Sequence, residues 1–180
     1  MSTTTHSKSS LFLMEIIIAI FFFSLASAIC LRLFASAHTL SDRDKDLNNA
    51  LLWSQNLSES FYGCNGDLEA IKALYPDAFL SEGVKNGDGT LIIFFNDDWE
   101  VVDDSLGEAS YEAIMVIKKD FASNVYSDVK EYKVLMNGKA ITGTIAVINI
   151  KDRSEKYLSI PNDPAHIIFS NNVDVYIGNE

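Results

Sequence analysis

Residues 11–31 read LFLMEIIIAIFFFSLASAICL, and this run decides the architecture of the chain. Its only ionisable side chains are those of Glu15 and Cys30. As an α-helix, these residues extend roughly 30 Å, which is the thickness of the hydrocarbon core of a bilayer. The run therefore predicts a helix that crosses a membrane once.

The residues before this run predict its orientation. Residues 1–10 are polar, Lys8 is their one firm positive charge, and no acidic residue occurs before Glu15. Positive charge before an apolar run keeps that end of the chain in the cytoplasm. We therefore expect a cytoplasmic leader at residues 1–10, a transmembrane helix at residues 11–35 in the cell membrane, and an extracytoplasmic head at residues 36–180.

Glu15 separates three interpretations of the apolar run. A carboxylate in the hydrocarbon layer costs roughly 2.5–3.5 kcal/mol at the centre and less near the edge, so a charge kept there indicates a partner. A cleaved secretory signal peptide is one alternative, because Ala26-Ser27-Ala28 and Ala35-Ser36-Ala37 fit a small-x-small cleavage pattern. A plain signal anchor is the second. The third is a processed helix in which Glu15 pairs with another subunit.

The motif around Glu15 favours the third interpretation. The hexapeptide SLFLME at residues 10–15, followed by IIIAI, resembles the prepilin processing site of type IV pilins and type II secretion pseudopilins. The resemblance implies that prepilin peptidase cuts between Ser10 and Leu11, that the new terminal amine is N-methylated, and that Glu15 is the fifth mature residue. It covers about the first 30 residues.

Three residues differ from the family pattern. Ser10 stands where glycine is usual, Leu11 where phenylalanine is commoner, and Arg32 where pilins often carry a helix breaker. Ser10 favours a minor subunit. Arg32 predicts the outer edge of the membrane or a contact within the fibre.

Cleavage at this bond would place a positive charge close to Glu15. Cleavage before Leu11 frees a cationic amine about one helical turn from the Glu15 carboxylate. In a stack of helices, each carboxylate can meet the amine of its neighbour in a low-dielectric core, where the pair attracts far more strongly than in water. The expected partners are therefore the membrane, prepilin peptidase and other pilin-like subunits.

A helical repeat continues beyond the membrane segment. Apolar residues recur at steps of three, four or seven with polar residues between them: Leu40, Leu47, Ala50, Trp53, Leu57 and Phe61. Gly63 and Gly66 end the pattern, which predicts one helix from Leu11 to about Tyr62. Asp67 predicts the cap of a second helix, Leu68–Tyr75.

Beyond a predicted loop at residues 81–90, the pattern changes to that of strands. Runs of β-branched and aromatic residues predict strands at 91–95, 99–102, 111–118, 129–136, 140–150 and 157–160. Asn137-Gly138 is a strong hairpin signal. Residues 111–118 predict a central strand with only its ends exposed. The fold class is therefore α+β, with a long N-terminal helix packed through its amphipathic half against an antiparallel sheet.

The head shows no pattern typical of catalysis or of metal binding. Residues 39–180 hold 24 of the 25 acidic and 12 of the 14 basic residues, so we expect no binding of nucleic acid. Seven acidic residues lie between Asp97 and Glu112, but their spacing matches no calcium loop, and we expect a solvated hairpin. No two histidines have metal-ligand spacing, and Cys64 is expected to be a buried or tolerated thiol.

These patterns predict a non-enzymatic structural subunit, a minor one, of a type IV pilus or pseudopilus-like filament, without a cofactor or a metal. The alternative is a single-pass anchored or secreted domain with a binding or sensory role that never polymerises.

Overall fold

The structure is a computed structural model that describes residues 5–81, 88–103, 107–127, 137–151 and 157–178. It contains two compact units, Met1–Lys45 and Asp46–Glu180. The described part of the first unit is helical, whereas the second unit combines a helical segment with a sheet.

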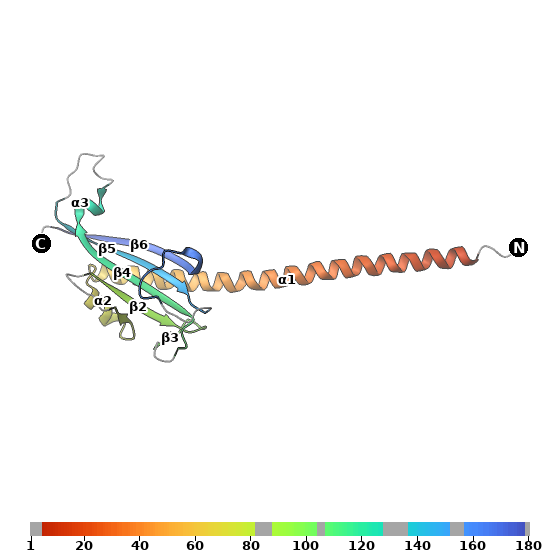
Figure 1. Cartoon of the computed structure of the whole chain (residues 1–180), viewed down its shortest axis with the longest axis horizontal. Coiled ribbons are helices and arrows are strands. Elements are labelled where there is room, and N and C mark those ends of the chain that lie inside the picture. Colours follow the sequence, from red (N-terminus) through yellow and green to blue (C-terminus); the bar gives the residue numbers. More distant parts are fainter. Residues whose placement is uncertain (1–4, 82–87, 104–106, 128–136, 152–156, 179–180) are drawn as a thin grey trace. The chain divides into compact units, whose positions relative to one another are not determined.

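Helix α1, Thr5–Gly63, is continuous (Figure 1). The predicted long helix is confirmed, but it begins at Thr5 and not at Leu11. The chain has no glycine or proline before Gly63, so no residue near the start of the helix interrupts its backbone hydrogen bonds. After α1, Asp67 caps helix α2, Leu68–Leu74, by accepting the backbone N–H of Glu69 at 3.0 Å.

The second unit contains one antiparallel sheet with the strand order β1-β2-β4-β5-β6, and β3 pairs with β2 (Figure 1). The strands are β1 Phe79–Leu80, β2 Gly89–Phe95, β3 Val101–Val102, β4 Tyr111–Phe121, β5 Lys139–Asn149 and β6 Ile167–Gly178. Two short helical segments, α3 Ala122–Val125 and the 3₁₀ turn η3 Pro164–His166, complete the described elements. The predicted α+β class, a long helix on an antiparallel sheet, is confirmed.

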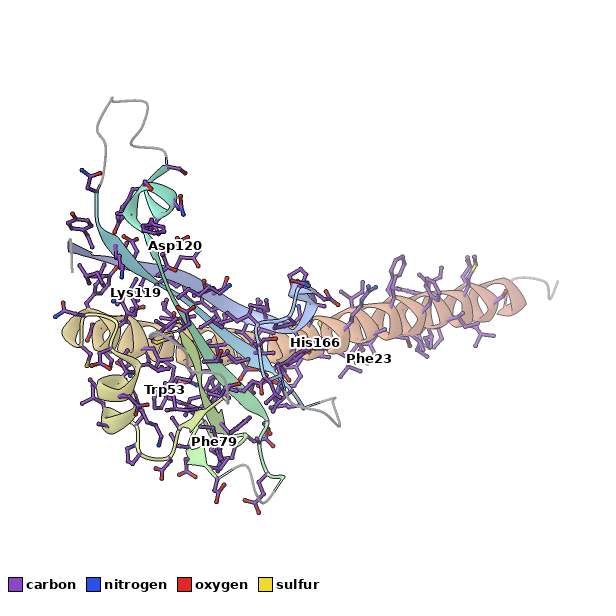
Figure 2. All side chains as sticks on the ribbon, turned by 60° about the vertical axis from the view of Figure 1, so that its left-hand side comes forward. Phe23, Trp53, Phe79, Lys119, Asp120 and His166 are labelled. Carbon is purple, nitrogen blue, oxygen red and sulfur yellow. The ribbon has the colours of Figure 1, made fainter. Side chains whose placement is uncertain are left out.

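One face of the sheet packs against the part of α1 that belongs to the second unit. Ala50, Leu57 and Phe61 of α1 are fully buried there. Trp53, which Figure 2 labels beside the sheet, has its ring centroid 4.6 Å from that of Phe95. Gly143 admits the Phe61 ring, because a Cβ at this position would lie 3.1 Å from Phe61 Cε2 and 2.8 Å from Val173 Cγ2. The predicted helical stripe therefore forms the helical side of the core from Ala50 onward, whereas its first two members, Leu40 and Leu47, are exposed.

The opposite face of the sheet is also covered. Ile92, Ile114 and Ile148 are buried in a second cluster, against which Tyr157 and Ile160 pack. Burial on both faces explains why β2 and residues 111–117 of β4 are mostly apolar. The predicted central position of residues 111–118 is confirmed, since β4 pairs with β2 on one side and with β5 on the other.

Several of the predicted strands differ from the observed ones. Residues 157–160 are irregular, and they cover the second cluster where a strand was expected. Strand β6 was not predicted at all, because its middle is polar. Strand β2 begins at Gly89, inside the predicted loop. The predicted strand at residues 129–136, which is one arm of the hairpin expected at Asn137-Gly138, lies outside the described residues.

Trp99 belongs to a turn and not to the predicted strand 99–102. Its φ of +63° is left-handed, and its backbone N–H donates to the carbonyl oxygen of Asn96 at 3.1 Å. The side-chain oxygen of Asn96 accepts the backbone N–H groups of Asp98 and Glu100 at 2.9 and 3.0 Å. These hydrogen bonds stabilise the turn, which the strand propensity of residues 99–102 does not indicate.

Candidate functional site

The predicted processing position lies inside α1. Ser10 and Leu11 are helical and exposed, and the Leu11 side chain is 64% exposed. They lie close to the N-terminal end of the helix, where the first four backbone N–H groups have no carbonyl partner within the helix. The predicted cleavage position therefore lies in the second turn of α1, with both side chains exposed.

Glu15 lies four residues after Leu11, so the two side chains share one face of α1 about 6 Å apart along the axis. The Glu15 side chain is exposed. It makes no hydrogen bond and no ion pair with any residue that the structure describes. Any partner for this carboxylate must therefore come from outside the described chain.

The side chains around Glu15 are apolar on every side of the helix. The neighbouring residues Leu13, Met14 and Ile16 are all exposed, and Phe23, farther along the helix, is 75% exposed (Figure 2). Within Ser10–Gly63, an 18-residue stretch is apolar enough to cross a membrane, and none of it is buried. The sequence prediction is confirmed to this extent: the N-terminal helix has the length and composition of a membrane span or of a signal.

The apolar segment ends at polar and charged residues on the same helix. Arg32 follows Leu11 by 21 residues, which corresponds to about 32 Å along a helix. Farther along, the ring of His38 lies 3.0 Å from the carboxylate of Asp42, and both side chains are largely exposed. The spacing between Leu11 and Arg32 matches the hydrocarbon thickness of a bilayer.

A polar and aromatic cluster in the second unit was not predicted from the sequence. The carboxylate of Asp46 accepts hydrogen bonds from the Tyr111 hydroxyl at 2.7 Å and from Trp99 Nε1 at 3.3 Å. The Trp99 and Tyr111 rings stack with centroids 4.1 Å apart. Lys151 Nζ lies 4.6 Å from the Tyr111 ring centroid and 2.7 Å from the Asp97 carboxylate. The cluster ties the turn before β3 and the start of β4 to α1.

Contacts within this cluster shift the pKa values of Tyr111, Asp97 and Lys151. Burial and the neighbouring Asp46 raise the pKa of Tyr111. The hydrogen bond from Lys151, followed by one from Ser110, lowers the pKa of Asp97. Burial opposes the charge on Lys151, but hydrogen bonds with Asp97 and Tyr111 outweigh it and raise the pKa of Lys151. These shifts favour the neutral form of Tyr111 and the charged form of Lys151.

Glu112 corrects the predicted solvated hairpin. Its side chain is fully buried on β4, and its two carboxylate oxygens accept the backbone N–H of Tyr157 at 3.1 and 3.3 Å. The cause is the second apolar cluster, which extends over the outer face of the sheet to the start of β4. Asp97, Asp98, Glu100 and Glu108 are exposed, as the prediction expected.

The described residues contain no group of three or more His, Cys, Asp or Glu side chains arranged to hold a metal ion. Cys30 is exposed, Cys64 is half-buried, and both are free thiols. The half-buried Cys64 packs against the apolar cluster beneath α1.

Comparison with known proteins adds no relative: no family model, no curated protein and no solved structure matches the chain.

Proposed function

We propose that the chain is a membrane-inserted subunit of a type IV pilus or pseudopilus-like filament, cut by prepilin peptidase before Leu11 and assembled through Glu15. The observation that supports this proposal is the state of Glu15. It is a carboxylate without a partner among the described residues, four residues after Leu11, on a helix that is apolar all round.

Both features of the segment require a second molecule. Apolar side chains exposed on every side of a helix are stable only in lipid or against other helices. A charge among them is costly unless it is paired. The amine of a cleaved Leu11 on a neighbouring copy satisfies the carboxylate, and one such pair per subunit sets the register of the stack.

The orientation follows from the leader. Lys8 holds the N-terminal end at the cytoplasmic face, so the acidic second unit faces outward, either at the membrane or on a surface filament. An outward-facing head with a net charge of −12 repels nucleic acid and stays soluble. Its role in this proposal is structural, and no enzymatic step is assigned to it.

The test is the mass and the N-terminal sequence of the full chain, purified from membranes of cells with and without prepilin peptidase. A methylated Leu11 terminus, formed only with the peptidase, is expected. The variant Ser10→Gly carries the residue usual in the family and provides the reference for complete processing. A terminus at Ile29 or His38 would show ordinary secretion. An intact Met1 or Ser2 in both strains would show a plain anchor, which is the non-polymerising alternative.

A further inference from the structure

Asparagine–glycine pairs occur at two exposed turns of the second unit, and the fold holds their backbones differently. The sequence contains three such pairs. Asn65-Gly66 follows α1, Asn137-Gly138 precedes β5, and Asn86-Gly87 lies outside the described residues. The side chains of Asn65 and Asn137 are both exposed. Because glycine has no Cβ, its backbone nitrogen approaches a preceding asparagine side chain more easily than that of any other residue.

The reaction at such a pair needs only water. The glycine amide nitrogen attacks the asparagine Cγ, the bond between Cγ and Nδ2 breaks, and the proton of the amide leaves with Nδ2 as ammonia, which closes a succinimide ring. Water then opens the ring at one of its two carbonyl carbons. Opening at Cγ gives aspartate, and opening at the former backbone carbonyl carbon gives isoaspartate. Either product carries a carboxylate in place of the amide, without oxidation or reduction.

The nucleophilic nitrogen of the first pair is already engaged. The N–H of Gly66 donates to the carbonyl oxygen of Phe61 at 2.8 Å, and this bond closes the C-terminal turn of α1. Gly66 is also buried, and a Cβ on it would lie 2.8 Å from Ile141 Cγ2. An attack on Asn65 therefore requires this packed turn to open first.

The nitrogen of the second pair is free, and the carbonyl group conjugated with it is not. Among the described residues, none accepts a hydrogen bond from the N–H of Gly138. The carbonyl oxygen of Asn137 belongs to the same peptide group, and it accepts the Tyr176 hydroxyl at 2.6 Å. Tyr176 lies on β6, 39 residues away along the chain.

This hydrogen bond favours the reactive form of the peptide group. The attacking species is the deprotonated amide of Gly138, and resonance places part of its negative charge on the carbonyl oxygen of Asn137. A donor at that oxygen stabilises the charged form over the neutral one. The fold therefore lowers the cost of generating the nucleophile at Asn137 and gives no such help at Asn65.

We propose that Asn137 is a site of spontaneous deamidation, that Tyr176 promotes the reaction, and that the C-terminal turn of α1 protects Asn65. The reaction requires no second copy of the chain and no cleavage before Leu11, so it does not depend on the proposed function.

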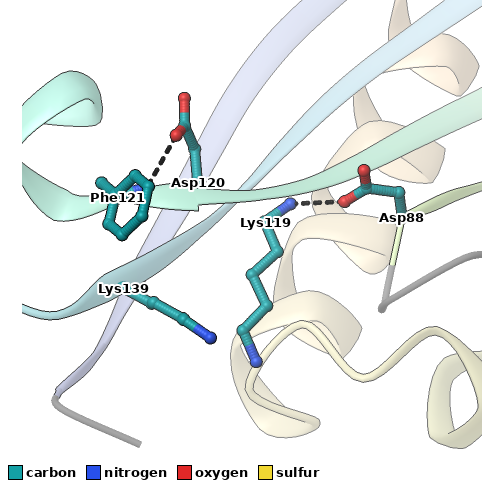
Figure 3. Close-up of a pocket in the computed structure, with 5 residues that line it drawn as sticks. All are labelled: Asp88, Lys119, Asp120, Phe121 and Lys139. Carbon is teal, nitrogen blue, oxygen red and sulfur yellow. Dashed lines mark hydrogen bonds between the residues drawn. The ribbon is translucent and has the colours of Figure 1, made fainter.

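Deamidation at this position changes one end of the sheet. Lys139, two residues after Asn137, pairs with Phe121, and both line a surface pocket together with Lys119 (Figure 3). Either product adds a negative charge two residues before Lys139. Isoaspartate also lengthens the backbone by one atom directly before β5. The product therefore differs from the parent chain in both charge and backbone geometry where β5 begins.

A time course in ¹⁸O-labelled water measures both sites in one sample. The full chain, folded in detergent, is incubated in H₂¹⁸O and digested, and mass spectrometry with peptide fragmentation locates each label. Only a residue hydrolysed during the incubation carries ¹⁸O. We expect label at position 137 to appear at least about tenfold faster than at position 65. Equal rates, faster labelling at position 65, or no label at position 137 would overturn the proposal.

The unfolded chain separates the effect of the fold from that of the flanking residues. In concentrated guanidinium chloride both pairs lose their hydrogen bonds, and the two labelling rates should agree within about threefold. If Asn65 reacted as slowly in the unfolded chain as in the folded one, the turn at the end of α1 would not be what protects it.

The variant Tyr176→Phe tests the donor. It should slow labelling at position 137 in the folded chain at least about threefold and have no effect in guanidinium chloride. Looser packing would instead raise the rate, so a fall identifies the hydrogen bond. The matched control is Tyr126→Phe, whose hydroxyl also contacts β6 but donates to Asp174, and it should leave the rate at position 137 unchanged. An unchanged or faster rate in Tyr176→Phe would refute the role of Tyr176.

Discussion

The Tyr111 hydroxyl donates a hydrogen bond of 2.7 Å to the Asp46 carboxylate and thereby joins the first residue of β4 to α1. Trp99 Nε1 donates to the same carboxylate oxygen. Both donors belong to buried residues, so the carboxylate satisfies two groups that water cannot reach. Asp46 thus fixes the register of α1 on the start of β4 and on the turn before β3.

Replacing Asp46 by alanine should destabilise the second unit by about 1–3 kcal/mol, because two buried donors lose their acceptor. Urea denaturation of the full chain in detergent, followed by tryptophan fluorescence, measures this change. Trp53 and Trp99 are the only tryptophans, and both belong to this unit. The control is Asp44→Ala, an exposed position two residues earlier, for which we expect a change within about 0.5 kcal/mol. Equal changes in the free energy of unfolding for the two variants would show that the Asp46 carboxylate does not stabilise the second unit.

The buried Glu112 should hold the segment around Tyr157 on the outer face of the sheet. In Glu112→Ala, we expect a loss of about 1–3 kcal/mol and faster hydrogen exchange at the Tyr157 amide, which loses its acceptor. Hydrogen-exchange mass spectrometry of the full chain measures the exchange rate in the peptide that contains this amide. Glu108→Ala removes an exposed carboxylate nearby and should leave the exchange unchanged. Unaltered protection at Tyr157 in Glu112→Ala would refute the anchoring role.

Tyr126 should make the second unit sensitive to alkaline pH. Burial and the hydrogen bond to Asp174 raise the pKa of Tyr126 from 10.0 to about 12. Between these values the folded state keeps a proton that the unfolded state has lost, so the free energy of unfolding falls as pH rises from about 10 to about 12.

The variant Tyr126→Phe has no phenol to titrate. Its free energy of unfolding, measured by urea denaturation with circular dichroism, should therefore fall less steeply than that of the parent protein between about pH 10 and 12. Below about pH 9 the two slopes should agree, because the phenol is protonated in both states. Identical slopes above pH 10 would exclude a linked titration of Tyr126.

Replacing Glu15 by alanine should remove the charge that sets the register between subunits. We expect the variant to insert into the membrane and keep its second unit folded, while incorporation into filaments falls at least about tenfold. Sheared filaments, quantified by immunoblot against total protein, give the readout. Glu59→Ala, the same substitution at an exposed position of the same helix, is the control. Filaments of Glu15→Ala in normal amounts would eliminate the proposed pairing.

The helices were predictable because their signals are local. Ala50, Leu57 and Phe61 recur at helical spacing, and the cap at Asp67 lies within three residues of the groups that it binds. Strand β2 and the first part of β4 were predictable for a related reason, since a strand segment buried on both faces is mostly apolar.

The remaining features depend on contacts between distant residues. Residues 157–160 form a short apolar run that suits a strand, but they pack as a cover over the sheet. The bond between Asp46 and Tyr111 spans 65 residues, and Lys119 approaches Lys139 only through the pairing of β4 with β5. Neither pair follows any spacing rule in the sequence. The roles of Leu11 and Glu15 stay predictions, because they come from the resemblance of residues 10–20 to a prepilin processing site.

Strand β6 shows why polar residues suit the edge strand of a sheet. Within the described residues it pairs with β5 alone, so twelve residues of backbone lie at the margin of the sheet. Ser170, Asn171, Asn172 and Asp174 are exposed along it. Such residues weaken the propensity that would have revealed the strand, and they also make the margin a poor template for recruiting another chain. The polarity that hides β6 in the sequence thus disfavours amyloid-like pairing of this edge with another chain.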